Sequence, residues 1–171
     1  MRSIPDPGFA GDDGSASPAL LEALTAYDGD PDTLHAATLA VLQGARLLVP
    51  VVAVLGEVER AEGDRGLRHE KISDMATVLL RGRDGRTALL AFSSVETLRR
   101  WNPDARPVPV GAGTAAEAAV CDDAAAMLVD VAGPVMFVVE GDDLRALARG
   151  HRLIRLGSGL NARYGWVRPD Q

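Results

Sequence analysis

The sequence is poor in cysteine, in lysine and in aromatic residues. Its 171 residues include one cysteine, Cys121, so no internal disulfide can form and an oxidising compartment is not indicated. Only 4% of the residues are aromatic, whereas 47% are hydrophobic and 25% are charged. This balance is typical of a globular domain, because a disordered chain has fewer apolar residues to bury. The length predicts one domain, with room for a short extension.

Long apolar runs and clustered metal ligands are also missing. The longest apolar run, residues 47–55, contains Pro50 and falls well short of the roughly 20 residues that a spanning helix needs. The first residues have no apolar stretch of the kind found in a secretory signal. His35, His69 and His151 lie far apart, with no cysteine or carboxylate at ligand spacing. We therefore expect a soluble, cytoplasmic protein without a metal site.

The net charge of −6 is distributed unevenly along the chain. Residues 1–45 carry seven acids and one base, whereas residues 141–171 carry six arginines and three acids. An acidic total argues against binding to nucleic acid or to an anionic membrane, since both need concentrated positive charge. We expect a protein partner instead. The acidic start and the basic end are predicted to attract each other, within one chain or between two copies, so a homodimer is one possible state.

Composition divides the chain into three parts. Residues 1–16 are rich in Gly, Pro and Asp and lack an apolar period, which predicts a mobile N-terminal arm. Residues 17–150 carry the periodic segments of one folded domain. Residues 151–171 form a basic C-terminal tail that we expect to pack on this domain.

The apolar patterns predict an α+β fold, a mostly antiparallel sheet of about five strands covered by helices. Pro50 is expected at a sheet edge or a bulge, because proline cannot donate to a strand ladder. Asp84-Gly85 between two strand-like runs predicts a hairpin with a primed turn. Helices are expected over 18–27, 31–43, 93–101, 114–125 and 142–149, and strands over 47–55, 75–80, 87–92, 127–131 and 135–140. Ser93 with Glu96, and Thr114 with Glu117, match the helix capping box.

One local pattern resembles a nucleotide site. Gly111, Gly113 and Ala116 fit a dinucleotide fingerprint, and Asp130 follows where an acid that binds the ribose is expected. Prolines in the preceding extended segment argue against it, because that strand is central in a dinucleotide fold. A nucleotide- or metabolite-dependent enzyme that uses the Gly111–Thr114 loop is therefore kept as an alternative, beside a plain glycine loop that enters a helix.

Two surface segments are candidates for binding a partner. Lys71 is the single lysine among 18 basic residues, and it lies close to Asp74 where a charged loop enters the hairpin. Trp101 and Arg106 follow a short predicted helix and could form a recognition patch. The alternatives are a surface lysine paired with Asp74 and a tryptophan that closes the core. These four residues, Lys71, Asp74, Trp101 and Arg106, are the predicted binding residues.

Several segments of the chain form a recognisable combination. They are 46–52, 71–76, 84–86, 88–94, Trp101, 105–110 and 131–134. Together they resemble the N-terminal domain of the SseB family, over roughly residues 20–150. The resemblance implies an α+β domain of uncharacterised molecular function, without catalytic residues or a cofactor, and with a possible link to serine sensitivity. The high alanine and arginine content resembles the actinobacterial branch, and the C-terminal domain of longer family members is expected to be missing.

These observations favour a non-catalytic binding or protein-interaction module over an enzyme, because the structural signals are complete and no coherent catalytic set accompanies them. The alternatives are the nucleotide- or metabolite-binding enzyme described above and a structural homo-oligomer.

Overall fold

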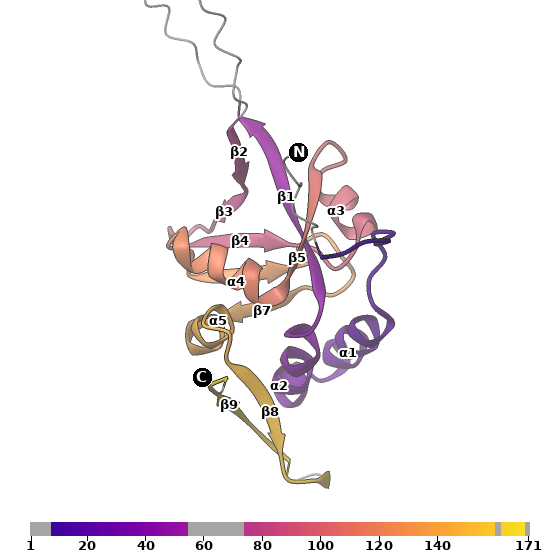
Figure 1. Ribbon diagram of the computed structural model, residues 1–171, viewed down its shortest axis with the longest axis vertical. Helices are drawn as coiled ribbons and strands as arrows, with labels where there is room; N and C mark the ends of the chain where they lie inside the picture. The colour runs from indigo at the N-terminus through magenta and orange to yellow at the C-terminus, as the bar shows by residue number, and fades with distance from the viewer. Residues whose placement is uncertain (1–7, 55–73, 160–161, 170–171) are drawn as a thin grey trace, which may run out of the picture.

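The computed structural model describes residues 8–54, 74–159 and 162–169. This part of the chain forms five helices, which surround small, steeply crossed sheets (Figure 1). None of the helices described is long and apolar enough to span a membrane. The helices are α1 (Pro18–Gly29), α2 (Pro31–Leu42), α3 (Val95–Trp101), α4 (Ala112–Cys121) and α5 (Gly141–Ala148). The strands are β1 (Arg46–Val54), β2 (Asp74–Thr77), β3 (Leu79–Arg81), β4 (Thr87–Ala91), β5 (Arg106–Gly111), β6 (Ala126–Val129), β7 (Phe137–Glu140), β8 (Arg152–Leu156) and β9 (Arg163–Val167).

The strands form three sheets, in the orders β2-β1-β5, β3-β4-β6-β7 and β8-β9. Every pair of neighbouring strands is antiparallel except β4 and β6. This confirms the predicted α+β class and its mostly antiparallel pairing. The two larger sheets are separate because the expected strand 75–80 changes partner at Val78. Thr77 still pairs with Val51 of β1, whereas the Val78 carbonyl accepts the N–H of Leu90 in β4.

Three prolines occupy strand positions that need no N–H donor. Alternate residues of an antiparallel strand direct their N–H and C=O groups to the same neighbour. Leu48 exchanges both backbone bonds with Phe92, each at 2.8 Å. The backbone nitrogen and carbonyl of Pro50 are therefore directed to the same side of β1 as those of Leu48. The pairing of β1 with β2 begins only at Val51, so no β2 residue is opposite Pro50. By the same alternation, the backbone nitrogens of Pro107 and Pro109 face the outer edge of β5, where no strand pairs with it. Pro50 thus lies in the central strand of its sheet, so the prediction of an edge or a bulge was wrong. The strand tolerates proline because no hydrogen bond of the ladder is lost at this position.

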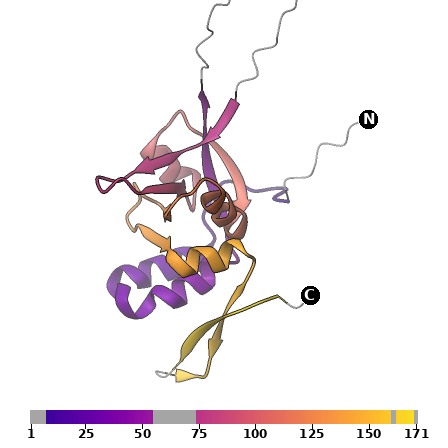
Figure 2. The ribbon, with the colours of Figure 1, turned by 90° about the vertical axis from the view of Figure 1, so that its left-hand side faces the viewer.

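The two faces of the four-stranded sheet bury different clusters. Leu89 and Met127 point into the main core, which α1, α2, α4 and α5 close. The next residue of each strand, Leu90 and Leu128, points the other way, toward a smaller cluster under α3. Figure 2 shows α5 in front of the α1–α2 pair, with the β8–β9 ribbon extending below them. One face of the sheet is therefore fully covered by helices, and the other only in part.

Helix α3 begins one residue later than its sequence predicts. Ser94 is the N-cap, and its hydroxyl accepts the N–H of Thr97 at 3.2 Å, while Thr97 bonds back to the N-cap N–H. The expected capping box of Ser93 and Glu96 was wrong by one position, because Ser93 bonds instead to the buried Asp130. A tertiary contact thus decides which of two adjacent serines caps the helix.

The hairpin between β3 and β4 is confirmed, but its turn differs from the expected type. The Gly85 N–H bonds to the Gly82 carbonyl at 3.0 Å, and the Gly82 N–H bonds to the Arg86 carbonyl at 2.8 Å. Only Gly85 of this loop has a positive φ, of 84°. The loop is therefore a three-residue turn with one left-handed glycine and not a two-residue primed turn, which would need further positive φ values.

Part of the predicted N-terminal arm is attached to the domain. Asp12 forms an ion pair with Arg46, with Oδ2 and Nε 2.8 Å apart, and the Gly14 carbonyl accepts the Val95 N–H at 2.8 Å. Gly14 has a φ of 80°, and a Cβ there would collide with the Val95 side chain. A glycine is thus required where the arm crosses α3. The division of the chain at residues 16 and 150 stays a prediction.

The predicted C-terminal tail contains the β8–β9 ribbon. The Gln43 side chain bonds to both the N–H and the carbonyl of Leu153, each at 2.8 Å. The indole N–H of Trp166 donates to Asp143 at 2.8 Å. The Gln43 bonds hold the outer edge of β8 at the end of α2, and the Trp166 bond holds one face of the ribbon against the start of α5.

Candidate functional site

The predicted binding residues occupy separate places in the fold. Lys71 lies outside the described residues. Asp74 begins β2 and the exposed Arg106 begins β5, and both pair with β1, three residue pairs apart. Asp74 and Arg106 therefore lie on opposite sides of one strand. The role of the four residues in binding stays a prediction.

Trp101 is half-buried at the end of α3 and packs against the smaller hydrophobic cluster. Its ring centroid lies 5.6 Å from that of Phe92, with 32° between the ring planes. Aromatic pairs at this distance contribute to stability beyond the area that they bury. The contact supports the alternative in which Trp101 closes the core.

The structural role of Trp101 can be separated from a binding role by two substitutions. We expect Trp101→Ala to lower the free energy of unfolding by about 2 kcal/mol, less than a fully buried ring would. Trp101→Phe keeps the contact with Phe92 and should cost less than about 1 kcal/mol. Urea unfolding followed by circular dichroism measures both values. Equal stability of Trp101→Ala and the wild type would contradict the packing role.

The Gly111–Thr114 loop does not build a dinucleotide-binding turn. The strand before it, β5, is an edge strand antiparallel to β1, whereas a dinucleotide fold needs a central strand in a parallel βαβ unit. Helix α4 begins at Ala112 with Gly111 as its N-cap, so Thr114 lies inside the helix and the expected capping box with Glu117 was wrong. A Cβ at Gly113 would lie 3.6 Å from the Leu147 carbonyl oxygen, which places this glycine against α5.

Asp130 is enclosed by the protein and does not face a ligand. Its side chain is buried, and its carboxylate accepts the Ser93 N–H at 2.8 Å, the Ser93 hydroxyl at 2.5 Å and the Thr97 hydroxyl at 2.6 Å. Its φ of 58° is left-handed, a conformation that Asp tolerates better than most residues. Asp130 thus ties the end of β6 to the start of α3, a role that the sequence did not indicate.

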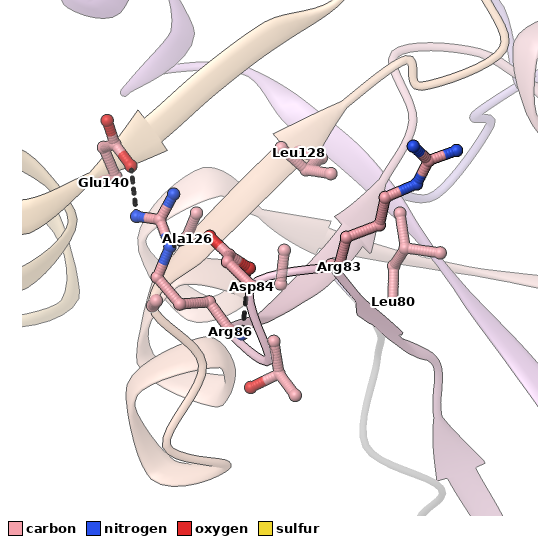
Figure 3. Close-up of a pocket in the computed structure, with 11 residues that line it drawn as sticks. Leu80, Arg83, Asp84, Arg86, Ala126, Leu128 and Glu140 are labelled. Atoms are coloured by element: carbon pink, nitrogen blue, oxygen red, sulfur yellow. Dashed lines mark hydrogen bonds and ion pairs between the residues drawn. The ribbon is translucent and has the colours of Figure 1, made fainter.

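The uncovered part of the four-stranded sheet forms a hollow of about 420 Å³ (Figure 3). Its floor is apolar and crosses three strands, because Leu80, Ala88 and Ala126 are opposite one another in the register. Leu128, one alternation further along β6, completes the floor, and Glu140 marks the end of β7. The hairpin loop forms the rim. The lining residues are Leu80, Gly82, Arg83, Asp84, Arg86, Thr87, Ala88, Ala125, Ala126, Leu128 and Glu140.

The rim of the hollow carries two arginines in different electrostatic states. Arg86 lies between two acids, with Nε 2.6 Å from Asp84 and a terminal nitrogen 3.6 Å from Glu140. The hydrogen bond from Arg86 lowers the pKa of Asp84, and Asp84 followed by Glu140 raises the pKa of Arg86. Arg83 makes no hydrogen bond or ion pair with any other described residue, and Figure 3 shows its guanidinium turned away from Asp84. Arg83 is thus the cation that remains available to a partner.

Strand β3 offers a free backbone edge next to this hollow. It is the outermost strand of its sheet. Val78 bonds to β4, and Gly82 bonds to Arg86 just before β4. By alternation Leu80 also faces β4, while Leu79 and Arg81 direct their N–H and C=O groups outward. The side chains of Leu79 and Leu80 are 37% and 42% exposed. An exposed edge with apolar side chains is a template for another strand.

The polar side chains that line the hollow are two arginines, two carboxylates and one hydroxyl. They belong to Arg83, Arg86, Asp84, Glu140 and Thr87. Within the described part of the chain, no three acidic, histidine or cysteine side chains are grouped to hold a metal. Sequence reasoning missed this site, although the arginines on both sides of Asp84-Gly85 and the alternation of β3 and β4 were signals for it.

The comparisons with known proteins identify the family. Residues 20–146 match the SseB protein N-terminal domain. The chain belongs to the SseB N-terminal domain family. No curated protein and no solved structure matches it significantly.

The family match covers the hollow and leaves out the ribbon. The matched region runs from the first turn of α1 into α5, so every lining residue of the hollow is part of the SseB domain. Strands β8 and β9 follow the matched region. A property of the ribbon is therefore not implied by membership of the family.

Proposed function

We propose that this SseB domain is a non-catalytic, cytoplasmic binding module that captures an extended segment of a partner protein along β3. The observation that carries the proposal is the free edge of β3 beside an apolar hollow with an unpaired arginine on its rim. The exposed, unpaired Cys121 is in keeping with a reducing compartment. Any effect on serine sensitivity is then indirect, through the captured partner.

The geometry specifies the chemistry of the captured segment. A strand added to β3 would bond through its main chain to Leu79 and Arg81, and alternate side chains would face the hollow. An apolar side chain of the segment would match the floor beside Leu80. A carboxylate two residues away would match the rim near Arg83. The rim arginine Arg83 disfavours a basic segment, since like charges oppose association there.

The proposal is tested with labelled peptides that place Leu and Glu two residues apart in a β-prone sequence. Fluorescence polarisation measures their affinity for the wild type and for two pairs of variants. Arg81→Pro removes only an N–H that faces the free edge, and Arg81→Ala is its control for the lost charge. Arg83→Glu reverses the rim charge, and Arg99→Glu is the matched control on α3, at an exposed arginine outside the hollow.

We expect Arg81→Pro and Arg83→Glu each to weaken peptide binding by about tenfold or more, and the two controls to bind as the wild type does. Replacing Glu by Lys in the peptide should weaken binding to the wild type and restore part of it in Arg83→Glu. Equal affinity of all variants, or no binding by any of these peptides, would overturn the β3 proposal.

The surface predicted from the sequence is a separate proposal. Asp74 and Arg106 flank β1 on the three-stranded sheet and lie outside the hollow. An Arg106→Ala variant that loses a natural partner, while Arg83→Glu retains it, would favour that surface over β3.

A further inference from the structure

We infer that two copies of this chain associate through the β8–β9 ribbon of each copy, which docks on the groove between α1 and α2 of the other. The inference does not depend on the peptide site at β3. It follows from two surfaces of opposite charge that the described chain leaves unpartnered at one end of the molecule.

The ribbon has one face against the domain and one face outward. Leu153 is opposite Trp166 in the register, and both belong to the held face. The other face presents Ile154, Leu156 and Val167, which are 37%, 51% and 39% exposed. A two-stranded ribbon is marginally stable on its own, and apolar side chains gathered on its outward face favour a partner.

Cations surround the outward face of the ribbon. Arg152 is opposite Val167 and Arg163 is opposite Leu156, so both arginines are on the same face as the apolar residues. Both are exposed, and neither forms an ion pair with another described residue. Residues 149–168 contain five arginines and no acid. The occupant of this face should therefore be apolar with acidic margins.

The outer side of the α1–α2 pair has the complementary character. It contains a groove of about 320 Å³, in which small residues of α1 face Leu34 and Val41 of α2. Glu22 lines the groove, and Asp28 and Asp32 lie exposed near the turn between the helices. Residues 18–42 contain four acids and no lysine or arginine. The groove residues are Ala19, Glu22, Ala23, Ala26, Leu34, Ala37, Thr38 and Val41.

The two surfaces do not satisfy each other within one chain. The ion pairs of the described residues link Asp12 to Arg46, Asp84 and Glu140 to Arg86, Glu96 to Arg100, and Asp142 to Arg145. None joins the acidic helices to the basic ribbon. Figures 1 and 2 both place the α1–α2 pair and the ribbon toward the same end of the molecule. Two copies related by a two-fold axis can therefore exchange both contacts at once, which closes the assembly as a dimer.

Sedimentation velocity of the full chain, from micromolar to millimolar protein, tests the inference. We expect a dimer at about 0.05 M sodium chloride that dissociates toward monomers at about 0.5 M, because salt screens exposed charges. Arg152→Glu with Arg163→Glu should weaken the dimer by about a hundredfold, because like charges then face each other across the contact. Glu22→Arg with Asp32→Arg should do the same from the other side. Arg99→Glu with Arg100→Glu, on α3, is the matched control and should leave the dimer intact.

Mixing the two charge-reversed proteins gives the decisive result. Each is expected to be monomeric alone, and the mixture should form a heterodimer, because opposite charges then face each other across both contacts. Circular dichroism and the melting temperature verify that each variant is folded. A monomeric wild type at low salt, a dimer unaffected by either reversal, or a mixture that stays monomeric would overturn the inference. A dimer lost only in Arg83→Glu would do so as well, by placing the contact at β3.

Discussion

Replacing Asp130 with alanine is expected to lower the free energy of unfolding by about 4 kcal/mol, since hydrogen bonds to a charged group contribute about 1.5–3 kcal/mol each and do not add fully. The substitution removes the acceptor of the Ser93 N–H and of the Ser93 hydroxyl, and leaves the Thr97 hydroxyl with only its longer bond to the Ser94 carbonyl. It also places alanine at a φ of 58°, which costs about 1–2 kcal/mol of the total. Urea unfolding measures the loss.

Asp130→Asn separates the charge of this residue from its conformation. Asparagine tolerates the left-handed backbone and keeps one carbonyl oxygen as an acceptor, so we expect a loss of only about 1–2 kcal/mol. Asp104→Ala is the control at an exposed acid and should change stability by less than about 0.5 kcal/mol. If Asp130→Ala lowers the free energy of unfolding no more than Asp104→Ala does, Asp130 does not hold the end of β6 to α3.

The loss should also be local. Asp130 holds Ser93 and Thr97 at the start of α3. Amide hydrogen exchange in Asp130→Asn is therefore expected to speed up in α3 before it does in α4 or α5. Uniform acceleration over all three helices would show that Asp130 acts on the whole domain instead.

Phe92→Ala is expected to cost a similar amount, about 3–4 kcal/mol, because a fully buried ring is removed and a cavity remains. Phe92 joins the two larger sheets. Its backbone bonds twice to Leu48 of β1, and its ring packs against Trp101. Phe92→Leu keeps most of the volume and should cost about 1 kcal/mol.

Val120→Ala is the control for Phe92→Ala, since Val120 is 40% exposed on α4. We expect a change of less than about 0.5 kcal/mol there. Near-ultraviolet circular dichroism should show a change in the tryptophan signal of Phe92→Ala, because the ring against Trp101 is lost. An unchanged signal, with stability equal to the wild type, would contradict the placement of Phe92 in the second cluster.

The sequence predicted the local elements well where the signal was local. The Asp84-Gly85 hairpin and the proline at the start of α2 depend on residues close in the chain, and both elements form as expected. The predicted helix at 93–101 also forms, but Asp130, far along the chain, takes Ser93 and moves the cap to Ser94. No periodicity in the sequence reports such a bond.

The candidate site depended on tertiary structure to a greater extent. Leu80 was recognised as part of a strand, but its place in the floor of the hollow depends on the register with Ala88 and, through β4, with Ala126. The alternation of β3 does not say whether the next layer covers that face. The helices cover one face and α3 only part of the other, which leaves the hollow open.

By itself the sequence determined the fold class, the resemblance to the SseB family and the asymmetry of charge, since all three depend on residue type and short-range spacing. Tertiary structure decided what those features do. Pro50 is tolerated in a central strand because no carbonyl of a neighbouring strand lies where its nitrogen would have to donate a hydrogen bond. Asp130 is a buried residue that hydrogen-bonds the start of α3, because β6 ends beside that helix. Among the described residues no ion pair joins the acidic helices α1 and α2 to the basic ribbon, because packing holds the ribbon by its other face. The dimer that we infer would bring those charges together.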